Sequence, residues 1–147
     1  MNAIANPNFA QDVLESFNRQ NAMALIRATM PVIRHGLTEI HIEHWQGVEQ
    51  QHGFVHGGVV GMIADSAAGY AAMTVVPAGA SVLSVEYKLN FAAPAAGEKL
   101  IARGEVVRPG KTLIVTRAQV YSVVEGQEKL CALMQQTIMV MYDKGEK

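Results

Sequence analysis

One carboxylate lies in the middle of a long stretch of the chain that is otherwise uncharged. From His56 to Val85, a span of 30 residues, Asp65 is the only residue with a formal charge. A carboxylate among apolar side chains is costly to desolvate unless another group pairs with it or a reaction uses it. Asp65 is therefore a candidate general base or nucleophile. The alternative is a structural acid that is hydrogen-bonded to Ser66 or to a backbone amide.

A His-Gly-Gly sequence at residues 56–58 begins the same uncharged stretch. Glycines at this place let a ligand or another backbone approach closely. If a helix begins here, its free amides and its dipole would hold a polarised carbonyl or an oxyanion. The alternative is that Gly57 and Gly58 only form a turn and that His56 caps the sheet.

The spacing of these two features limits how they can act together. Asp65 lies eight residues beyond Gly57, which is about 12 Å along a helix that rises about 1.5 Å per residue. One small reacting group cannot contact both positions in a single chain. Two such helices packed antiparallel about a two-fold axis would bring Asp65 of one chain to Gly57 of the other. If both features are catalytic, the site is shared between two copies of the chain.

The elements that must position these residues begin with two helices and a strand. Apolar residues at three- and four-residue spacings over residues 8–29 predict an amphipathic N-terminal helix that Pro31 ends. Residues 37–45 alternate between apolar and polar side chains, which predicts a strand. Gly57 then opens about 18 residues of small and apolar side chains, typical of a helix that ends near Pro77. Because this second helix is apolar nearly all round, other structure must surround it.

The second half of the sequence is β-rich. Residues 81–92 alternate between an apolar set, which includes Val85 and Tyr87, and a polar set, which includes Ser84 and Glu86. Short turn sequences separate the later strands, which predicts antiparallel neighbours. The expected fold class is α+β, with a long antiparallel sheet wrapped around a central apolar helix. Three further strands are expected at residues 98–107, 112–124 and 129–141.

Composition narrows the functional classes. The chain has 147 residues, with no visible repeat or linker, so we expect one domain over residues 1–147. Twelve Lys and Arg against 13 Asp and Glu give a net charge of −1, and no clustered positive charge is present for nucleic acid. The single cysteine, Cys131, excludes an internal disulfide and a cysteine-built zinc site. The histidines are not spaced to chelate a metal, so no metal site is expected.

Localisation follows from two further patterns. The N-terminus has no basic segment followed by an apolar one, so no secretory signal is expected. The 20 uncharged residues between Asp65 and Glu86 are long enough to cross a bilayer, but they contain Pro77 and Gly79 and are rich in small residues. We therefore expect a cytoplasmic protein without a membrane span.

Three segments together resemble the hotdog-fold thioesterases of the phenylacetate-pathway type. They are GlnGlnHisGlyPheValHisGlyGly at residues 50–58, the nine-residue step from His56 to Asp65, and SerValGluTyrLysLeuAsnPhe at residues 84–91. The resemblance covers about residues 36–141. It implies a hotdog fold that pairs into a homodimer and often again into a homotetramer. It also implies hydrolysis of an acyl-CoA substrate to free acid and CoA, with no metal or other cofactor.

The resemblance assigns roles to five residues. Asp65 would be the general base or nucleophile at the thioester carbonyl. The backbone amide of Gly57 or Gly58 would supply the oxyanion contact, with His56 orienting that turn or the substrate carbonyl. Ser84 matches a Ser or Thr that helps to hold the water near the acid.

Four more residues are candidates with less specific patterns. Gln50 stands where many members of the family have an Asn that positions the water or the leaving group, and it keeps the amide on a side chain longer by one methylene. The Arg-Pro-Gly-Lys turn offers Arg108 and Lys111 as partners for the CoA phosphates, and Arg117 lies on the next expected strand. The alternative for these cations is an ordinary solvated surface.

Two other functions stay open at this point. One is a non-catalytic acyl-CoA-binding hotdog module, because a fold does not determine a function. The other is a hotdog hydratase or dehydratase, although those enzymes usually pair a catalytic His with an acid in a different local motif. The sequence does not predict which acyl group is preferred.

Overall fold

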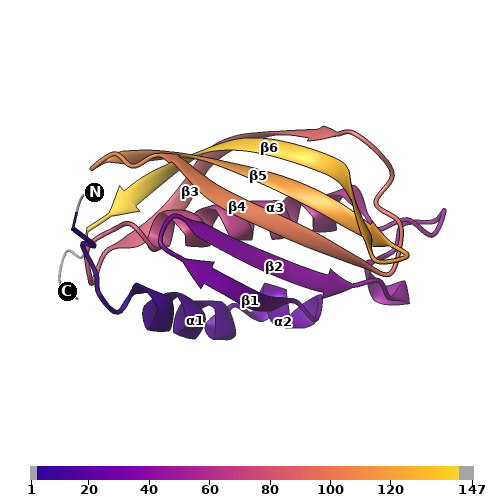
Figure 1. Ribbon diagram of the computed structural model, residues 1–147, viewed down its shortest axis with the longest axis horizontal. Coiled ribbons are helices and arrows are strands. Elements are labelled where there is room, and N and C mark those ends of the chain that lie inside the picture. Colours follow the sequence, from indigo (N-terminus) through magenta and orange to yellow (C-terminus); the bar gives the residue numbers. More distant parts are fainter. Residues whose placement is uncertain (1–2, 143–147) are drawn as a thin grey trace.

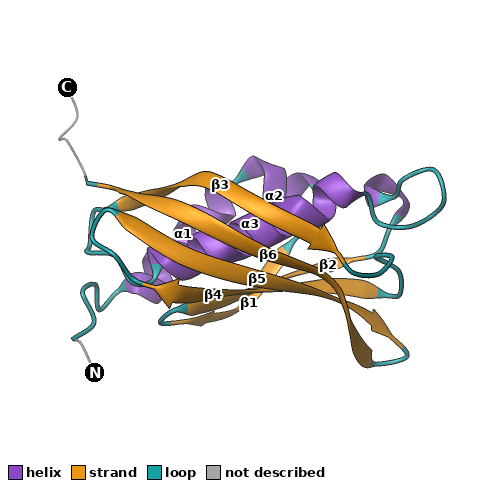
Figure 2. Ribbon diagram, turned by 90° about the horizontal axis from the view of Figure 1, so that it is seen from above, coloured by secondary structure: helices purple, strands orange, loops and turns teal. Residues whose placement is uncertain are grey.

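The structure is a computed structural model that describes residues 3–142. Its six strands form one antiparallel sheet in the order β1-β2-β4-β5-β6-β3. The sheet curves around α3 (Figure 1), and all three α-helices lie on the same side of it (Figure 2). The expected α+β architecture, a long antiparallel sheet around a central helix, is confirmed. In chain order the elements are α1 (Phe9–Arg19), α2 (Asn21–Leu25), β1 (Thr29–Arg34), β2 (Leu37–Glu43), the 3-10 helix η1 (Gln46–Val48), α3 (Gly57–Met73), β3 (Ser81–Phe91), β4 (Lys99–Arg108), β5 (Leu113–Val124) and β6 (Gln127–Met141).

The central helix α3 begins and ends close to the predicted positions. It has a run of fully buried alanines on the side that faces the sheet. Small side chains there let the helix backbone lie close to β4. A Cβ built on Gly104 of β4 would fall 2.3 Å from the carbonyl carbon of Ala67, so any larger residue at Gly104 would push helix and sheet apart.

The strands of the second half also follow the prediction. In β5 and β6 buried residues alternate with exposed ones over most of their length, because one face packs on α3 and the other faces solvent. The β5–β6 connection is a two-residue turn in which Glu125 and Gly126 have φ values of 50° and 75°. Two positive φ values in succession match the twist of a tight hairpin, and this fixes the register of the two longest strands.

The N-terminal part differs from the prediction of one helix over residues 8–29. The helix is broken at Gln20 into α1 and α2, and the chain then enters a strand that the sequence analysis missed, β1. Apolar residues such as Met23 stay buried beyond the break. The apolar spacing in the sequence therefore runs on across two helices and does not reveal the break between them. Pro31 lies inside β1 rather than ending a helix. A proline is tolerated there because β1 is an edge strand and its pairing with β2 is irregular around Pro31.

The uncharged stretch between Asp65 and Glu86 does not form a single element. It contains the second half of α3, a connecting loop and the start of β3. Within residues 3–142, no helix is both long enough and apolar enough to span a membrane.

Candidate active site

Asp65 lies on α3 and is joined to Ser84 and Gln136 in a ring of three hydrogen bonds. The Ser84 hydroxyl donates to Asp65 Oδ1 at 2.6 Å. The Gln136 side-chain amide donates both to the same Oδ1 and, at 2.8 Å, to Ser84 Oγ. Among residues 3–142, Asp65 has no cationic partner within ion-pair distance and no donor to Oδ2. Oδ1 of Asp65 therefore accepts two hydrogen bonds, whereas Oδ2 accepts none from residues 3–142.

A β-bulge in β3 turns Ser84 toward Asp65. Ser84 pairs with the buried Ile138 of β6, Glu86 pairs with Thr137, and Val85 is left without a partner. The extra residue reverses the alternation, so Ser84 lies on the same face of β3 as Tyr87 rather than with Glu86. Simple alternation had placed Ser84 on the polar face, which is wrong. Bulges of this kind re-aim side chains beside active sites.

Gln136 is a site residue that the sequence analysis missed. It belongs to β6 and is completely buried, between Met134 and Ile138 on the face that packs on α3. Its Oε1 accepts a hydrogen bond of 3.4 Å from Thr116 Oγ1 of β5. The available signal was a glutamine at an inward position of an alternating strand, because a buried amide needs hydrogen-bond partners.

Asp65 and Ser84 line a cavity of about 470 Å³ that lies between α1, α3 and the first half of β3. The cavity wall formed by α1 is polar. The hydroxyls of Ser16 and Tyr70 lie 3.3 Å apart, Tyr70 donates to Gln20 at 3.2 Å, and Gln20 donates to Ser66 at 3.4 Å. Burial raises the pKa of Tyr70, so its hydroxyl keeps its proton. The N-terminal helix thus contributes polar groups directly to the cavity that holds Asp65.

The start of α3 is capped by its own histidine. Nδ1 of His56 accepts a hydrogen bond of 2.8 Å from the Gly58 amide, so this amide is not available to a substrate oxygen. The Gly57 amide has no acceptor among residues 3–142. Of the two amides that the sequence analysis considered, the free one is therefore that of Gly57. His56 caps the helix, not the sheet.

Gln50 lies near Gly57, away from Asp65. Gln50, Phe54, Gly57 and Phe91 line a second cavity of about 460 Å³. Oε1 of Gln50 accepts a hydrogen bond from the backbone amide of His52, which leaves its amide nitrogen without an acceptor among residues 3–142. The chain thus carries its candidate groups in two separate places: the acid in one cavity, and the free backbone amide with Gln50 in the other.

The three candidate cations for CoA differ in their surroundings. Arg117 donates two hydrogen bonds of 2.9 and 2.6 Å to Glu105 on the face of the sheet away from α3, so the structure does not bring it to either cavity. Arg108 and Lys111 are exposed in the β4–β5 turn and form no ion pair within the described residues. That turn lies at the end of the sheet where β3 begins, because Thr112 accepts from the Val140 amide beside the pairing of β3 with β6.

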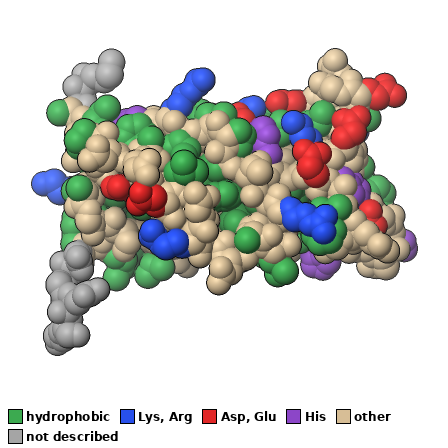
Figure 3. Space-filling view, turned by 90° about the horizontal axis from the view of Figure 1, so that it is seen from below, with side chains coloured by type: hydrophobic (Ala, Val, Ile, Leu, Met, Phe, Trp, Pro, Cys, Tyr) green, Lys and Arg blue, Asp and Glu red, His purple; other side chains and the backbone are tan. Residues whose placement is uncertain are grey.

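Charge is mixed over the surface. On the face in Figure 3, acidic and basic side chains lie close to each other, with no broad basic area. Within residues 3–142, no group of three or more His, Cys, Asp or Glu side chains is placed to hold a metal ion. Burial raises the pKa of Cys131 to about 11, so this cysteine is a packed thiol and not a nucleophile.

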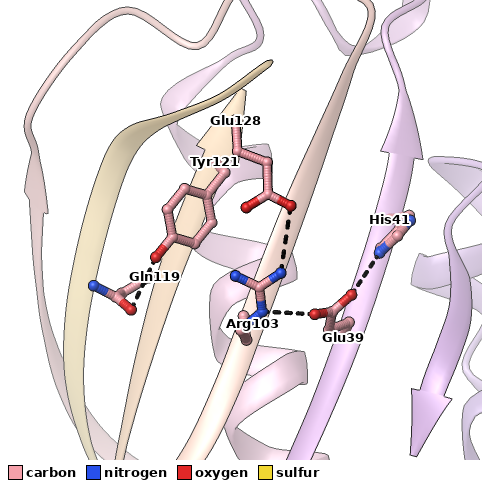
Figure 4. A network of polar contacts seen from close by, with 6 residues as sticks. All are labelled: Glu39, His41, Arg103, Gln119, Tyr121 and Glu128. Atoms are coloured by element: carbon pink, nitrogen blue, oxygen red, sulfur yellow. Dashed lines mark hydrogen bonds and ion pairs between the residues drawn. The ribbon is translucent and has the colours of Figure 1, made fainter. Parts of the chain in front are cut away.

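A second polar network lies on the outer face of the sheet (Figure 4). Glu39 of β2 accepts hydrogen bonds from Arg103 at 2.6 Å and from His41 at 3.0 Å. Arg103 also reaches Glu128 at 3.4 Å and lies over the ring of Tyr121. Burial alone would raise the pKa of Glu39, but the hydrogen bonds from His41 and Arg103 outweigh it, so the pKa lies below its ordinary value. This network lies outside both cavities.

Comparisons with known proteins agree with this architecture. Residues 52–129 match the family model of the thioesterase superfamily. A thioesterase family protein from Silicibacter pomeroyi is 41% identical, with 92% of this chain and 99% of that chain covered and a TM-score of 0.90. The E. coli PaaI protein from the phenylacetic acid degradation operon is 20% identical, covers 92% and 94% of the two chains and has a TM-score of 0.79.

Two further results complete the comparison. A protein from Bacillus halodurans, solved with CoA, is 23% identical, covers 91% of this chain and 86% of that chain, and has a TM-score of 0.74. Curated protein sequences gave no match. Fold and site together define a hotdog protein with an acid on its central helix. The chain belongs to the thioesterase superfamily and is a thioester hydrolase, which confirms the resemblance found in the sequence.

Proposed function

We propose that the protein hydrolyses acyl-CoA thioesters and that Asp65 is its general base or nucleophile. The observation that carries this proposal is the placement of Asp65: its carboxylate is held by Ser84 and Gln136 and lines an open cavity. A purely structural acid would have both oxygens engaged. The CoA in the Bacillus halodurans relative supports CoA as the thiol component.

The two cavities of one chain support a site that is completed by a second chain. Asp65 lies eight residues after Gly57 on the same helix, so the two groups are about 12 Å apart. The free Gly57 amide of one copy would meet the Asp65 cavity of another if two α3 helices packed antiparallel. The proposed assembly is therefore a homodimer with two shared sites, and pairing into a homotetramer is compatible with it.

The edge of the sheet offers a surface for this dimer. β3 is an edge strand of 11 residues, and it exposes Leu83, Val85, Tyr87 and Phe91 by 46–60%. A long edge strand with exposed apolar side chains presents unpaired backbone groups to another chain. Packing two copies along β3 would cover these side chains and bring the two α3 helices together.

The proposed chemistry uses each group in a defined step. Asp65 removes a proton from water that attacks the thioester carbonyl, or it attacks the carbonyl first to give an anhydride that water then opens. The Gly57 amide of the other chain stabilises the negative charge that develops on the carbonyl oxygen. CoA leaves as a thiolate, and the cations Arg108 and Lys111 are the proposed contacts of its phosphates. A cytoplasmic location remains a prediction from the sequence.

Release of free CoA thiol from a panel of acyl-CoA thioesters tests the reaction. The panel contains acetyl-, hexanoyl-, decanoyl-, phenylacetyl- and benzoyl-CoA, and the wild type is compared with Asp65→Asn. The variant keeps the volume and removes the base, so we expect turnover to fall roughly 100-fold or more. If neither protein releases thiol while both bind acyl-CoA, the protein is a binding module and the enzymatic proposal is wrong.

Mixing two inactive variants tests the shared site. Gly57→Pro removes the Gly57 amide hydrogen while a proline suits the first position of a helix, and His56 already has φ −58° and ψ 136°, as a residue before proline requires. Gly57→Ala keeps the amide and is the matched control. A mixed dimer of Asp65→Asn and Gly57→Pro chains would contain one intact site, so activity should return on mixing. No recovery in a demonstrated mixed dimer would place each site within one chain.

A further inference from the structure

Gln136 is a buried polar side chain for which packing alone gives no reason. It is fully buried on β6, among apolar residues that pack on α3. A buried amide is costly unless its donors and its acceptor are all engaged. Both hydrogens of Nε2 have acceptors, Asp65 Oδ1 and Ser84 Oγ. Oε1 lies 3.4 Å from the Thr116 hydroxyl, whose single proton it shares with the backbone oxygen of Gln136 at the same distance. The environment of this strand position is therefore built to hold a glutamine amide.

The orientation of the Gln136 amide is determined by its neighbours. If the amide were reversed, Oε1 would lie against the carboxylate of Asp65, acceptor against acceptor, and the Nε2 hydrogens would face the Thr116 hydroxyl. Gln136 therefore presents only donors to Asp65. An amide does not gain or lose a proton in the physiological pH range, so this donor is present at every working pH.

Ser84 completes the same arrangement. Its oxygen accepts from Gln136, so its own proton is directed to Asp65 Oδ1. Oδ1 thus receives two hydrogen bonds, while Oδ2 receives none from residues 3–142. The two oxygens of one carboxylate are no longer equivalent, because one is bound to the protein and the other is free beside the cavity.

From this geometry we propose that Gln136 is the positioning residue of the site. It anchors Oδ1 of Asp65 and leaves Oδ2 to water or to the thioester carbonyl, and it orients the Ser84 hydroxyl at the same time. This proposal rests on the proposed thioester hydrolysis for the identity of the substrate, but not for the position of Asp65.

The groups that contact the Asp65 carboxylate are neutral donors and not cations. Asp12, Glu15 and Arg19 of α1 line the same cavity, and Ser84 and Gln136 face Asp65 from β3 and β6. Within residues 3–142, no cation forms an ion pair with Asp65. The position of the carboxylate is therefore held by the two hydrogen bonds to Oδ1, and removal of the Gln136 donor has no cationic substitute.

The test compares Gln136→Met with Gln135→Met. Methionine has nearly the volume of glutamine but no donor, and Gln135 is the exposed neighbour whose side chain faces the other side of the sheet. For Gln136→Met we expect kcat to fall about 10- to 100-fold with KM little changed. Gln135→Met should match the wild type in both quantities.

A second variant and a spectroscopic readout strengthen the test. Gln136→Glu keeps the shape but replaces the Nε2 donor with an oxygen that faces Oδ1 of Asp65, acceptor against acceptor, so its kcat should fall at least as far as that of Gln136→Met. The NMR chemical shift of the Asp65 carboxyl carbon, recorded at one pH without substrate, should change in Gln136→Met and stay at the wild-type value in Gln135→Met.

Several outcomes would overturn the proposal. If Gln136→Met melts at a lower temperature but keeps the wild-type kcat and the wild-type chemical shift of the Asp65 carboxyl carbon, Gln136 is only structural. The same conclusion follows if Gln135→Met changes both quantities equally. If the wild type releases no thiol from any acyl-CoA, the proposed function fails, and the NMR chemical shift alone decides whether Gln136 positions Asp65.

Discussion

Two carboxylates on opposite faces of one sheet differ in how their oxygens are used. On the outer face, Glu39 has both oxygens engaged, Oε1 by Arg103 and Oε2 by His41. On the inner side, Asp65 has two donors on Oδ1 and none on Oδ2 among residues 3–142. Glu39 has a cation as a neighbour, whereas Asp65 has only neutral donors and a cavity.

The difference separates an acid that stabilises the fold from one that is prepared to react. A carboxylate paired with a guanidinium has its charge neutralised, and a substrate would have to break that pair before using it. Neutral donors hold a carboxylate in place without neutralising its charge, and a free oxygen leaves room for a proton or a carbonyl carbon. Burial does not distinguish the two acids, because both are partly buried. The two acids differ instead in how the hydrogen bonds are distributed between the two oxygens of each carboxylate.

The largest expected effect is that the same substitution reduces activity at one acid and stability at the other. Glu39→Gln and Asp65→Asn are the same chemical change on the two faces of the sheet. We expect Asp65→Asn to lose roughly 100-fold or more in kcat with little loss of stability. Glu39→Gln should stay within about twofold of wild-type kcat but be less stable. Thiol release and urea unfolding measured on both variants check this, and equal losses of activity would remove the distinction.

The pH dependence of stability sharpens the same comparison. The pKa of Glu39 is lower in the folded protein than its ordinary value of 4.5. Its stabilising contribution is therefore complete above the unfolded-state value and is lost as the pH falls through the folded-state value. We expect Glu39→Gln to lower the free energy of unfolding by about 1–2 kcal/mol at pH 7. The gap should close as the pH falls below 4.5 and through the lower folded-state pKa of Glu39, where the wild-type side chain gains a proton.

Urea unfolding of wild type and Glu39→Gln between pH 3 and 7 measures this gap. The other charged or titratable groups in the network are His41, Arg103 and Glu128, and both proteins contain them, so their contributions largely cancel in the difference. A gap of the same size at pH 3 and pH 7 would show that Glu39 acts through packing and not through its charge.

The fold was largely predictable because its periodicities are clean. The apolar run after Gly57 predicts a helix that other structure must cover. The alternating residues from residue 81 onward predict a sheet with one apolar face that can cover it. The N-terminal prediction failed at Gln20 because α1 and α2 keep the same buried side across the break. β1 was missed because Pro31 argues against a strand unless that strand is known to lie at an edge.

The site was predictable only where one residue carried the signal. Asp65 stood out by its charge, and Gly57 by its place at the start of a helix. Ser84 was assigned by resemblance but placed on the wrong face by alternation, since a bulge leaves no clear mark in a sequence. Gln136 lies 71 residues from Asp65, and the two meet because β6 packs on α3 with Gln136 on its inner face. Contacts between such distant elements depend on strand register and packing, which local patterns do not encode.

The smallest expected effect concerns two tyrosines, one from each region. Tyr70 joins α1 to α3 through Ser16 and Gln20, whereas Tyr121 bonds Gln119 on the outer face at 3.0 Å. Removing the Tyr70 hydroxyl with Tyr70→Phe loosens the polar cavity wall, and one such hydrogen bond is worth about 0.5–1.5 kcal/mol. We expect KM for the best acyl-CoA of the panel to rise by about two- to tenfold with kcat nearly unchanged. Tyr121→Phe is the matched control and should leave KM at the wild-type value. Steady-state kinetics of the two variants test this expectation. Equal KM values would mean that α1 packs on the protein without shaping the cavity that Asp65 lines.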